Sequence, residues 1–287
     1  MRLSGLFALC ALAVAGVAPS AIAQELIWDV AVGGVDTVFI EELTAGEVAA
    51  AIRAGKTTVI VPTGGVEQNG PHVVTGKHNY VVRVAAEATA RRLGNALVAP
   101  VVPFVPEGTI DPPSGQMLYA GTISVREETF RSLLIDICAS LKQHGFTDIM
   151  LIGDSGGNQP GLEAVAKRLS AAWASDPANA YYIAAFYAED MYSYDYLKSL
   201  GIVQQPDRRT AVRNNIHTDY QAEAMVAVTD PELIRADQRI AAGDFSVHGV
   251  DMVSAQAVVA NGAKLVDYRA DITARAIRRA IAAARQR

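Results

Sequence analysis

The stretch from Val59 to Tyr80 constrains the fold of this chain more than any other part of its sequence. It opens with a run of β-branched residues, 57–61, which is typical of a strand buried on both faces of a parallel sheet. Pro62 and four glycines then predict an irregular loop before the next helix. Because α/β proteins build sites in loops at the carboxyl ends of parallel strands, this loop is the first candidate for an active site.

The loop is rich in side chains that bind metals or carry protons. Glu67 lies close in sequence to His72 and His78, which are two of the five histidines of the chain. A solvated turn accounts for any one of these residues, whereas a glutamate and two histidines in one glycine-rich loop favour a functional site. Asn69 and His72 are candidate substrate ligands in this loop.

Residues 1–23 predict a secretory signal peptide. Arg2 gives a short basic start, residues 6–17 form an apolar core too short to be a membrane anchor, and Ala21 and Ala23 give the small residues of a cleavage site. Cleavage would leave Cys138 as the only cysteine. We therefore expect a periplasmic or secreted protein without an internal disulfide.

The composition of the predicted mature chain, 24–287, bounds its partners. Loss of Arg2 leaves 24 of the 25 basic residues against 30 acidic ones, a net charge of about −6. This balance argues against nucleic acids and anionic membrane surfaces as partners. With no repeat, low-complexity segment or linker, 24–287 is predicted to be a single domain.

The periodicity of apolar residues predicts alternating strands and helices. We expect strands at 37–40, 57–61, 96–102, 148–152 and 181–186, and a weak one at 258–259. Capping boxes at Thr44 and Ser124 begin two helices, and further helices are expected at 79–93, 162–173, from Pro231 and at 271–287. Cys138 falls on an apolar helix face and is predicted to be core. The order indicates an α/β fold with a βαβ crossover sheet, and the long loop 103–121 a lid or site wall.

A second glycine-rich loop, 153–158, follows the strand at 148–152 and is expected to face the first loop. Ser155 lies there at a strand end beside glycine N–H groups, which would suit a nucleophile in acyl transfer, or else it caps the following helix. Asp154 and Asn158 are candidate substrate ligands. His217 is a candidate proton carrier oriented by Asp219, although both would also fit a helix cap.

Three motifs in consistent order between about Thr37 and Pro231 resemble a known family. Glu67, Gln68, Gly70, Pro71 and His72 are similar to the Glu-Gln-His-Gly-Pro-His signature of the creatininase (creatinine amidohydrolase) family. Residues 120–125 are similar to its Pro-Gly-Thr-Ile-Ser-Leu, and 156–158 to the end of its Asn-Gly-His-Gly-Gly-Asn. The resemblance implies a three-layer α/β/α sandwich around a mostly parallel sheet, a homo-oligomer that is often a hexamer, and hydrolysis of non-peptide amides by a metal-bound water.

The chain departs from the family pattern at the metal ligands. The resemblance keeps the family carboxylate at Glu67 and the general acid/base at His217, but its ligand histidines fall on Asn69 and Ser155, and its bridging aspartate falls on His78. A neutral imidazole lacks the two lone-pair donors that a bridging ligand needs. We therefore expect at most one divalent ion, with zinc favoured, at Glu67 and His78, and with Asp154, His217 or Asp219 as a third ligand.

The sequence thus predicts a periplasmic hydrolase of the creatininase type that acts on an amide or cyclic amide bond of a small molecule. Two alternatives stay open. One is a metal-free, serine-type hydrolase that uses Ser155. The other is a small-molecule binding protein that has lost catalysis together with the missing ligands.

Overall fold

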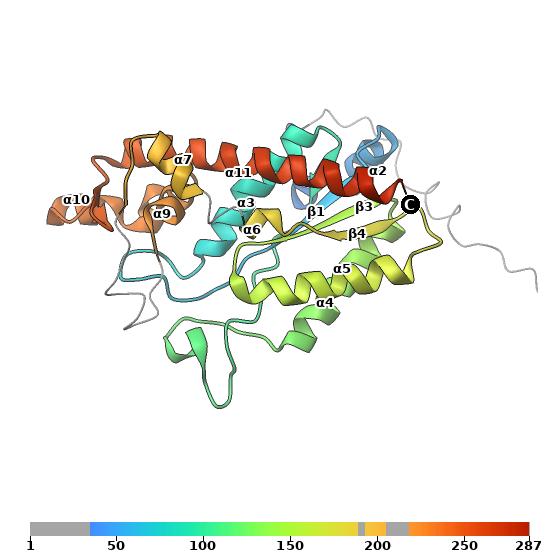
Figure 1. Ribbon diagram of the computed structural model, residues 1–287, viewed down its shortest axis with the longest axis horizontal. Coiled ribbons are helices and arrows are strands. Elements are labelled where there is room, and N and C mark those ends of the chain that lie inside the picture. The colour runs from blue at the N-terminus through green and yellow to red at the C-terminus, as the bar shows by residue number, and fades with distance from the viewer. Residues whose placement is uncertain (1–34, 189–192, 205–217, 287) are drawn as a thin grey trace, which may run out of the picture. The chain divides into compact units, whose positions relative to one another are not determined.

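The computed structural model describes residues 35–188, 193–204 and 218–286 (Figure 1). The N-terminal part of the fold comprises η1 (Ile40–Glu42), α2 (Ala45–Arg53), β1 (Thr58–Thr63), α3 (Lys77–Leu93), β2 (Ala96–Val98), η2 (Gly115–Leu118) and α4 (Glu127–Gln143). The middle part comprises β3 (Asp148–Gly153), η3 (Gly156–Asn158), α5 (Gln159–Ala172), β4 (Asn179–Tyr182), α6 (Ala185–Ala188) and α7 (Ser193–Ser199). The C-terminal part comprises α9 (Tyr220–Ala227), η5 (Pro231–Ile234), α10 (Ala236–Ala242), β5 (Ser246–Val247), β6 (Val250–Asp251) and α11 (Ala255–Ala284).

Four strands form one parallel sheet in the order β2-β1-β3-β4. β1 lies inside the sheet, where Thr58 to Thr63 pair with the whole of β3, Asp148 to Gly153. Helices connect the successive strands, as the predicted crossover topology requires. Because Thr63 pairs with Gly153, the loops that leave β1 and β3 start side by side.

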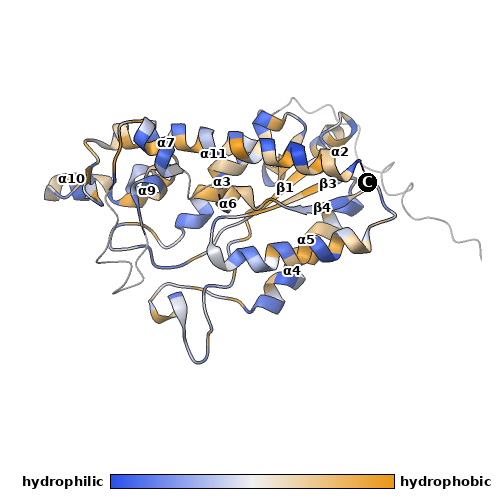
Figure 2. Ribbon diagram, viewed as in Figure 1, coloured by the Kyte–Doolittle hydropathy of each residue, from blue (hydrophilic) through white to orange (hydrophobic). Residues whose placement is uncertain are grey.

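Helices cover both faces of this sheet and confirm the predicted three-layer α/β/α architecture. Val59 and Val61 of β1 belong to a core cluster with residues of α4 and α5, whereas Ile60 belongs to a second cluster with residues of α3 and α11. Both faces of the strand are therefore apolar, which explains its continuous β-branched run. Figure 2 shows β1 and β3 as mostly orange ribbons between helices of mixed colour.

A third apolar cluster joins the C-terminal elements to α3. α9 contacts both α11 and α3, and Met225, Val258 and Leu265 are buried in this cluster. Cys138 is buried in the core as predicted, and burial raises the pKa of its thiol to about 12. The cysteine is therefore a packing residue and not a nucleophile.

Some predicted elements are wrong in extent or type. The strand expected at 37–40 is reduced to one bridge between Phe39 and Val98, because η1 begins at Ile40. Residues 258–259 lie inside α11, which begins at Ala255 and not at 271. Burial of Val258, Leu265 and Val266 against α9 at helical spacing overrides the β propensity of the valines.

The two predicted capping boxes have different outcomes. Thr44 caps α2 with Glu47 in the reciprocal pattern that was predicted. Ser124 caps no helix, since Arg126 is the N-cap of α4. Instead, Ser124 Oγ accepts a hydrogen bond from the backbone N–H of Glu107 at 2.9 Å and donates one to the Gly108 carbonyl at 2.7 Å. Ser124 therefore anchors the long loop that follows β2.

The predicted signal peptide, 1–23, lies outside the described residues. The described residues belong to one compact unit, 34–287, and the assignment of 24–287 to a single domain stays a prediction. In the part of the chain that the structure describes, no helix combines the length and the apolarity needed to cross a membrane.

Candidate active site

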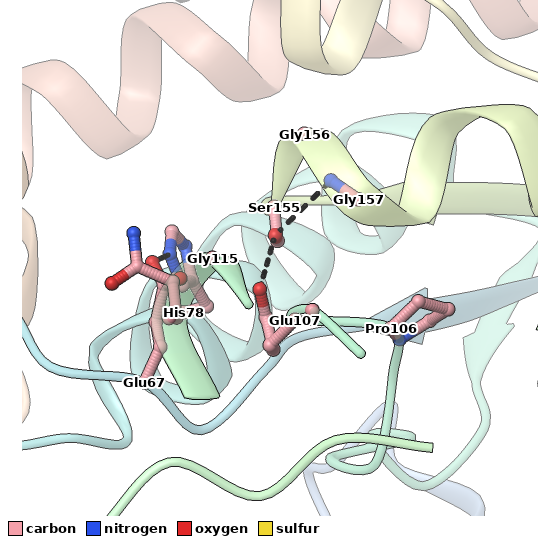
Figure 3. Close-up of a pocket in the computed structure, with 10 residues that line it drawn as sticks. Glu67, His78, Pro106, Glu107, Gly115, Ser155, Gly156 and Gly157 are labelled. Atoms are coloured by element: carbon pink, nitrogen blue, oxygen red, sulfur yellow. Dashed lines mark hydrogen bonds and ion pairs between the residues drawn. The ribbon is translucent and has the colours of Figure 1, made fainter. Parts of the chain in front are cut away.

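Three loops meet at the carboxyl ends of β1, β2 and β3. The backbone N–H of Asp154 donates to the Thr63 carbonyl at 3.1 Å, which joins the first and second glycine-rich loops. Together with the loop at 103–121 they enclose a cavity of about 450 Å³ (Figure 3). Glycines and Pro106 form much of its wall, and its polar side chains are Glu67, His78, Glu107, Gln116 and Ser155.

His78 lies in the first turn of α3, buried between two carboxylates. Its Nδ1 lies 2.7 Å from Asp154 Oδ2, and its Nε2 lies 2.7 Å from Glu67 Oε1. A neutral imidazole has one N–H, so hydrogen bonds to two carboxylates require a proton on both nitrogens. Burial and the charge of Lys77 oppose this proton, but the hydrogen bonds to Asp154 and Glu67 outweigh them and raise the pKa of His78. The two hydrogen bonds therefore favour the imidazolium form of His78.

Arg269 of α11 completes the ion pairs behind His78. Its Nη1 donates to Asp154 Oδ1 at 2.7 Å, and both side chains are buried. Burial alone would raise the pKa of Asp154, but the charges of Arg269 and His78 reverse the effect and lower it to about 2. Asp154 is therefore ionised and contacts two cations.

Sequence reasoning missed Arg269. One signal was present, since Arg269 lies four residues after Leu265 and three before Ile272, on the apolar stripe of the helix. A lone arginine on a buried stripe needs a buried acidic partner.

Glu107 is the second carboxyl group in the cavity, and sequence reasoning missed it too. Its Oε2 accepts a hydrogen bond from Ser155 Oγ at 3.2 Å (Figure 3). Gly65 permits its close approach, because a Cβ there would lie 2.1 Å from Glu107 Oε1. The loop at 103–121 was predicted to form a site wall, and Glu107 and Asp111 are its only acids. Ser124 holds the backbone of Glu107 and Gly108, and this tertiary contact decides that Glu107 faces the cavity.

Glu107 is protonated near neutral pH. Burial and the nearby charge of Glu67 raise the pKa of Glu107 to about 8, and a hydrogen bond between the two carboxyl groups adds to the shift. Such a bond needs one shared proton, and Glu107 provides it. In addition, Glu107 Oε1 meets no hydrogen-bond donor among the described residues, which favours a neutral carboxyl. The cavity thus holds one neutral and one ionised glutamate.

Ser155 lies at the cavity wall and also caps η3. Its Oγ accepts a hydrogen bond from the backbone N–H of Gly157 at 3.4 Å while it donates to Glu107. Among the described residues, the side chain that accepts the hydrogen bond of the Ser155 hydroxyl is thus a glutamic acid and not a histidine. A glutamic acid that keeps its proton near pH 7 does not act as the base for a serine nucleophile.

The predicted substrate ligands have mixed positions. Asn158 ties the two glycine-rich loops together, since its Nδ2 donates to Thr63 Oγ1 at 2.8 Å and to the Gly64 carbonyl at 2.9 Å. Asn69 donates to the Glu67 carbonyl at 2.9 Å, within its own loop. His72 is half-buried and does not line the cavity, and Asp154 lies behind His78. These residues shape the site more than they face a ligand.

His217 lies outside the described residues, so its assignment as proton carrier stays a prediction. Asp219 caps α9, where its Oδ1 accepts a hydrogen bond from the backbone N–H of Ala222 at 2.7 Å. Its Oδ2 accepts another from the Tyr194 hydroxyl at 3.1 Å. Asp219 therefore has the capping role that the sequence left open, and it does not line the cavity.

The predicted metal ligands, as the structure places them, do not fit a divalent ion. Each nitrogen of His78 is hydrogen-bonded to a carboxylate, and a doubly protonated ring has no lone pair for a metal. Glu107 is a neutral acid, and Ser155 is a weak ligand. Over the described ranges, no group of three or more His, Cys, Asp or Glu side chains is arranged to hold a metal ion.

Comparison with known proteins gives a family match over most of the chain. The family model named creatininase, described as creatinine amidohydrolase, matches residues 41–282. A 3-dehydro-scyllo-inosose hydrolase of Thermotoga maritima is 28% identical over 99 residues, which cover 34% of this chain and 30% of that protein. Creatinine amidohydrolase of Pseudomonas putida is 28% identical over 116 residues, which cover 40% of this chain and 44% of that protein. The matched stretches thus span less than half of either relative.

Solved structures with the same fold cover most of this chain. A tryptophan-to-alanine mutant of creatininase has a TM-score of 0.61 at 20% identity, over 85% of this chain and 98% of that one. A crystal structure of creatinine amidohydrolase has a TM-score of 0.56 at 19% identity, over 86% and 97%. Other solved creatininases are described as a manganese form, a Zn–Zn form and a complex with creatine. At this identity the similarity establishes the fold.

Proposed function

The chain belongs to the creatininase family, and we propose that it hydrolyses an amide or cyclic amide bond of a small molecule in the cavity between its three loops. The observation that carries the proposal is the pair of carboxyl groups there. Glu107 is held neutral beside Glu67, whose carboxylate pairs with His78. Two carboxyls whose pKa values are driven apart can supply the acid and the base of one hydrolysis.

The reaction needs one proton taken from water and one given to nitrogen. In this proposal Glu67 accepts a proton from water as the oxygen attacks the carbonyl carbon, and Glu107 gives its proton to the nitrogen as the C–N bond breaks. The proton on Glu67 then returns to Glu107 through the hydrogen bond between them. The products are a carboxylic acid and an amine, which for a cyclic amide stay in one molecule.

No step of this route passes through a metal ion. The manganese and Zn–Zn forms of solved creatininases make a divalent ion a reasonable expectation for the family, but the ion expected from the sequence at Glu67 and His78 does not fit these side chains as the structure places them. His217 keeps the role of an additional proton carrier, also as a prediction. Family membership favours a small-molecule substrate, which the creatine complex of a solved creatininase supports.

Two further expectations belong to this proposal. The signal-like sequence at 1–23 supports a periplasmic or secreted location. Family membership supports a closed homo-oligomer, with a hexamer as the first expectation. Fractionation of cells that express the full chain tests the location.

A substrate panel tests the activity. The mature protein is assayed on small cyclic amides, linear amides, formamides and lactones, with and without chelator. Glu107→Gln and Glu67→Gln keep the shape of the side chains but remove the acid and the base, so each should lower turnover about 10²–10⁴-fold. Glu128→Gln, at an exposed position of α4, is the matched control and should be unchanged.

The same assay separates the alternatives. Ser155→Ala should leave most activity, because loss of a cap costs about 1 kcal/mol of stability whereas loss of a nucleophile abolishes turnover. Loss of activity in Ser155→Ala with full activity in Glu67→Gln would support the serine-type route. Tight binding of one panel member without turnover would support a binding protein and would end the hydrolase proposal.

A further inference from the structure

Four buried side chains behind the cavity form a linear series of ion pairs. Arg269 contacts Asp154, Asp154 contacts His78 and His78 contacts Glu67, each at 2.7 Å. The four side chains are 3–7% exposed. Carboxylates and cations alternate along this series, so every charge has an opposite neighbour. A buried series of this kind is stable only when it is complete.

The spacing at the end of this series leaves no room for an ion. Zinc bonds of about 2.0–2.2 Å at a tetrahedral angle would place a nitrogen ligand and an oxygen ligand about 3.4 Å apart. His78 Nε2 and Glu67 Oε1 are 2.7 Å apart, which is the distance of a charge-assisted hydrogen bond. The proton on Nε2 occupies the position that a metal would need.

The charge balance points the same way. Arg269 and His78 already compensate Asp154 and Glu67 in this series. A divalent ion would add two positive charges to a balanced set, and uncompensated charge is costly to bury.

We propose that Arg269 and the doubly protonated His78 form a built-in cation pair that takes the place of a divalent ion, so that this site is complete without metal. His78 is then a positioning residue, which holds the Glu67 carboxylate toward the cavity through Nε2–H. Asp154 fixes the ring from the other side, and α11 supplies the second cation. The statement about activity rests on the proposed hydrolase function, whereas the statement about the assembled site does not.

The resting mature protein tests the assembled site without any substrate. Elemental analysis after dialysis should find well below one zinc, manganese or iron ion per chain. Added Zn²⁺, Mn²⁺ or EDTA should shift the Tm by less than about 1 °C, because a ligand that does not bind the native state does not stabilise it. ¹⁵N NMR of the ring nitrogens should show His78 protonated at both positions at pH 7.

A charge-reversing variant gives the positive arm of the test. His78→Asp removes one cation and places a third carboxylate beside Glu67 and Asp154, which is a ligand type that hard divalent ions prefer. Addition of Mn²⁺ or Zn²⁺ should raise the Tm of this variant by about 4 °C or more. The matched control, His72→Asp, lies in the loop before α3 and outside the cavity, and its Tm should not rise with either ion. If His78→Asp does not fold, the measurements on the unmodified protein decide alone.

Several results would overturn the proposal. They are a stoichiometric ion that survives dialysis, a lower Tm in chelator, or a His78 ring with only one protonated nitrogen. Once the panel yields a substrate, activity that persists in chelator supports the proposal, and activity lost in chelator contradicts it. An inactive panel with a metal-free, doubly protonated site would refute the hydrolase function but not the cation pair.

Discussion

Glu107 carries its proton at a pH where glutamates are normally ionised. Its pKa is about 8 in the folded protein against an ordinary value of 4.5, because burial and Glu67 disfavour the ionised form. The folded state therefore binds one proton more than the unfolded state between these two values. Unfolding then releases a proton, and the free energy of unfolding falls as the pH rises through this window.

This residue gives the first prediction. The contribution of Glu107 to stability should be fully present below about pH 4.5 and lost as the pH rises to about 8. Glu107→Gln cannot titrate, so thermal melts between pH 5 and 8.5 should show a smaller loss of stability with pH than the unmodified protein. Glu128→Gln, an exposed glutamate, should keep the original slope. Equal slopes for all three proteins would mean that Glu107 is ionised throughout.

α11 is the element that connects the C-terminal part of the fold to the active site. It packs on α9 and α3 and sends Arg269 to Asp154 in the second glycine-rich loop. The same helix carries Arg275, whose side chain is 56% exposed and pairs with Asp271 at 3.1 Å. One helix thus presents a buried and an exposed arginine, each paired with an aspartate.

The second prediction compares these two arginines. Arg269→Met should cost about 3–5 kcal/mol of unfolding free energy, because it leaves Asp154 buried with one cation fewer. Arg275→Met should cost about 0–1 kcal/mol, since exposed pairs are screened by water. Urea denaturation gives both values. A cost below about 1 kcal/mol for Arg269→Met would show that the buried pair is not formed.

A double variant checks the cause. Asp154→Asn combined with Arg269→Met removes both charges, so its cost should be smaller than the sum of the two single variants. Additive costs would mean that the two side chains act independently.

At the scale of the whole molecule, four large apolar side chains are exposed in or next to the segment that walls the cavity. Phe104, Ile110, Leu118 and Ile123 are 46–65% exposed, although soluble monomers rarely expose many large apolar side chains together. A second copy of the chain would cover such a surface, as the family membership leads us to expect.

The third prediction is that the mature protein is a closed homo-oligomer. Light scattering at micromolar concentration should give a mass of several chains, and Leu118→Lys should lower it by placing a charge on the apolar segment. Val203→Lys, at a similarly exposed apolar residue that lies outside this segment, is the control. A monomeric unmodified protein would contradict the prediction.

The sequence predicted the central part of the fold because local patterns determine it. The β-branched run at 57–61, the capping box at Thr44 and the helix that ends at Gly94 all depend on neighbours within a few residues. It also indicated that Glu67, His78 and Ser155 belong to one region, because loops at the carboxyl ends of parallel strands must meet. Family motifs in consistent order gave the three-layer architecture.

Only the tertiary structure decided the chemistry of the site. Glu107, His78 and Arg269 come from three separate segments. The protonation states of Glu107 and His78 depend on partners that lie far away along the chain, and Arg269 pairs with an aspartate 115 residues away. The sequence pattern indicates only that His78 belongs to the site. Its burial and its hydrogen bonds to two carboxylates, each at 2.7 Å, favour its protonated form. Desolvation and charge contacts act through space, so the sequence determined which groups are available, and packing decided which of them are charged.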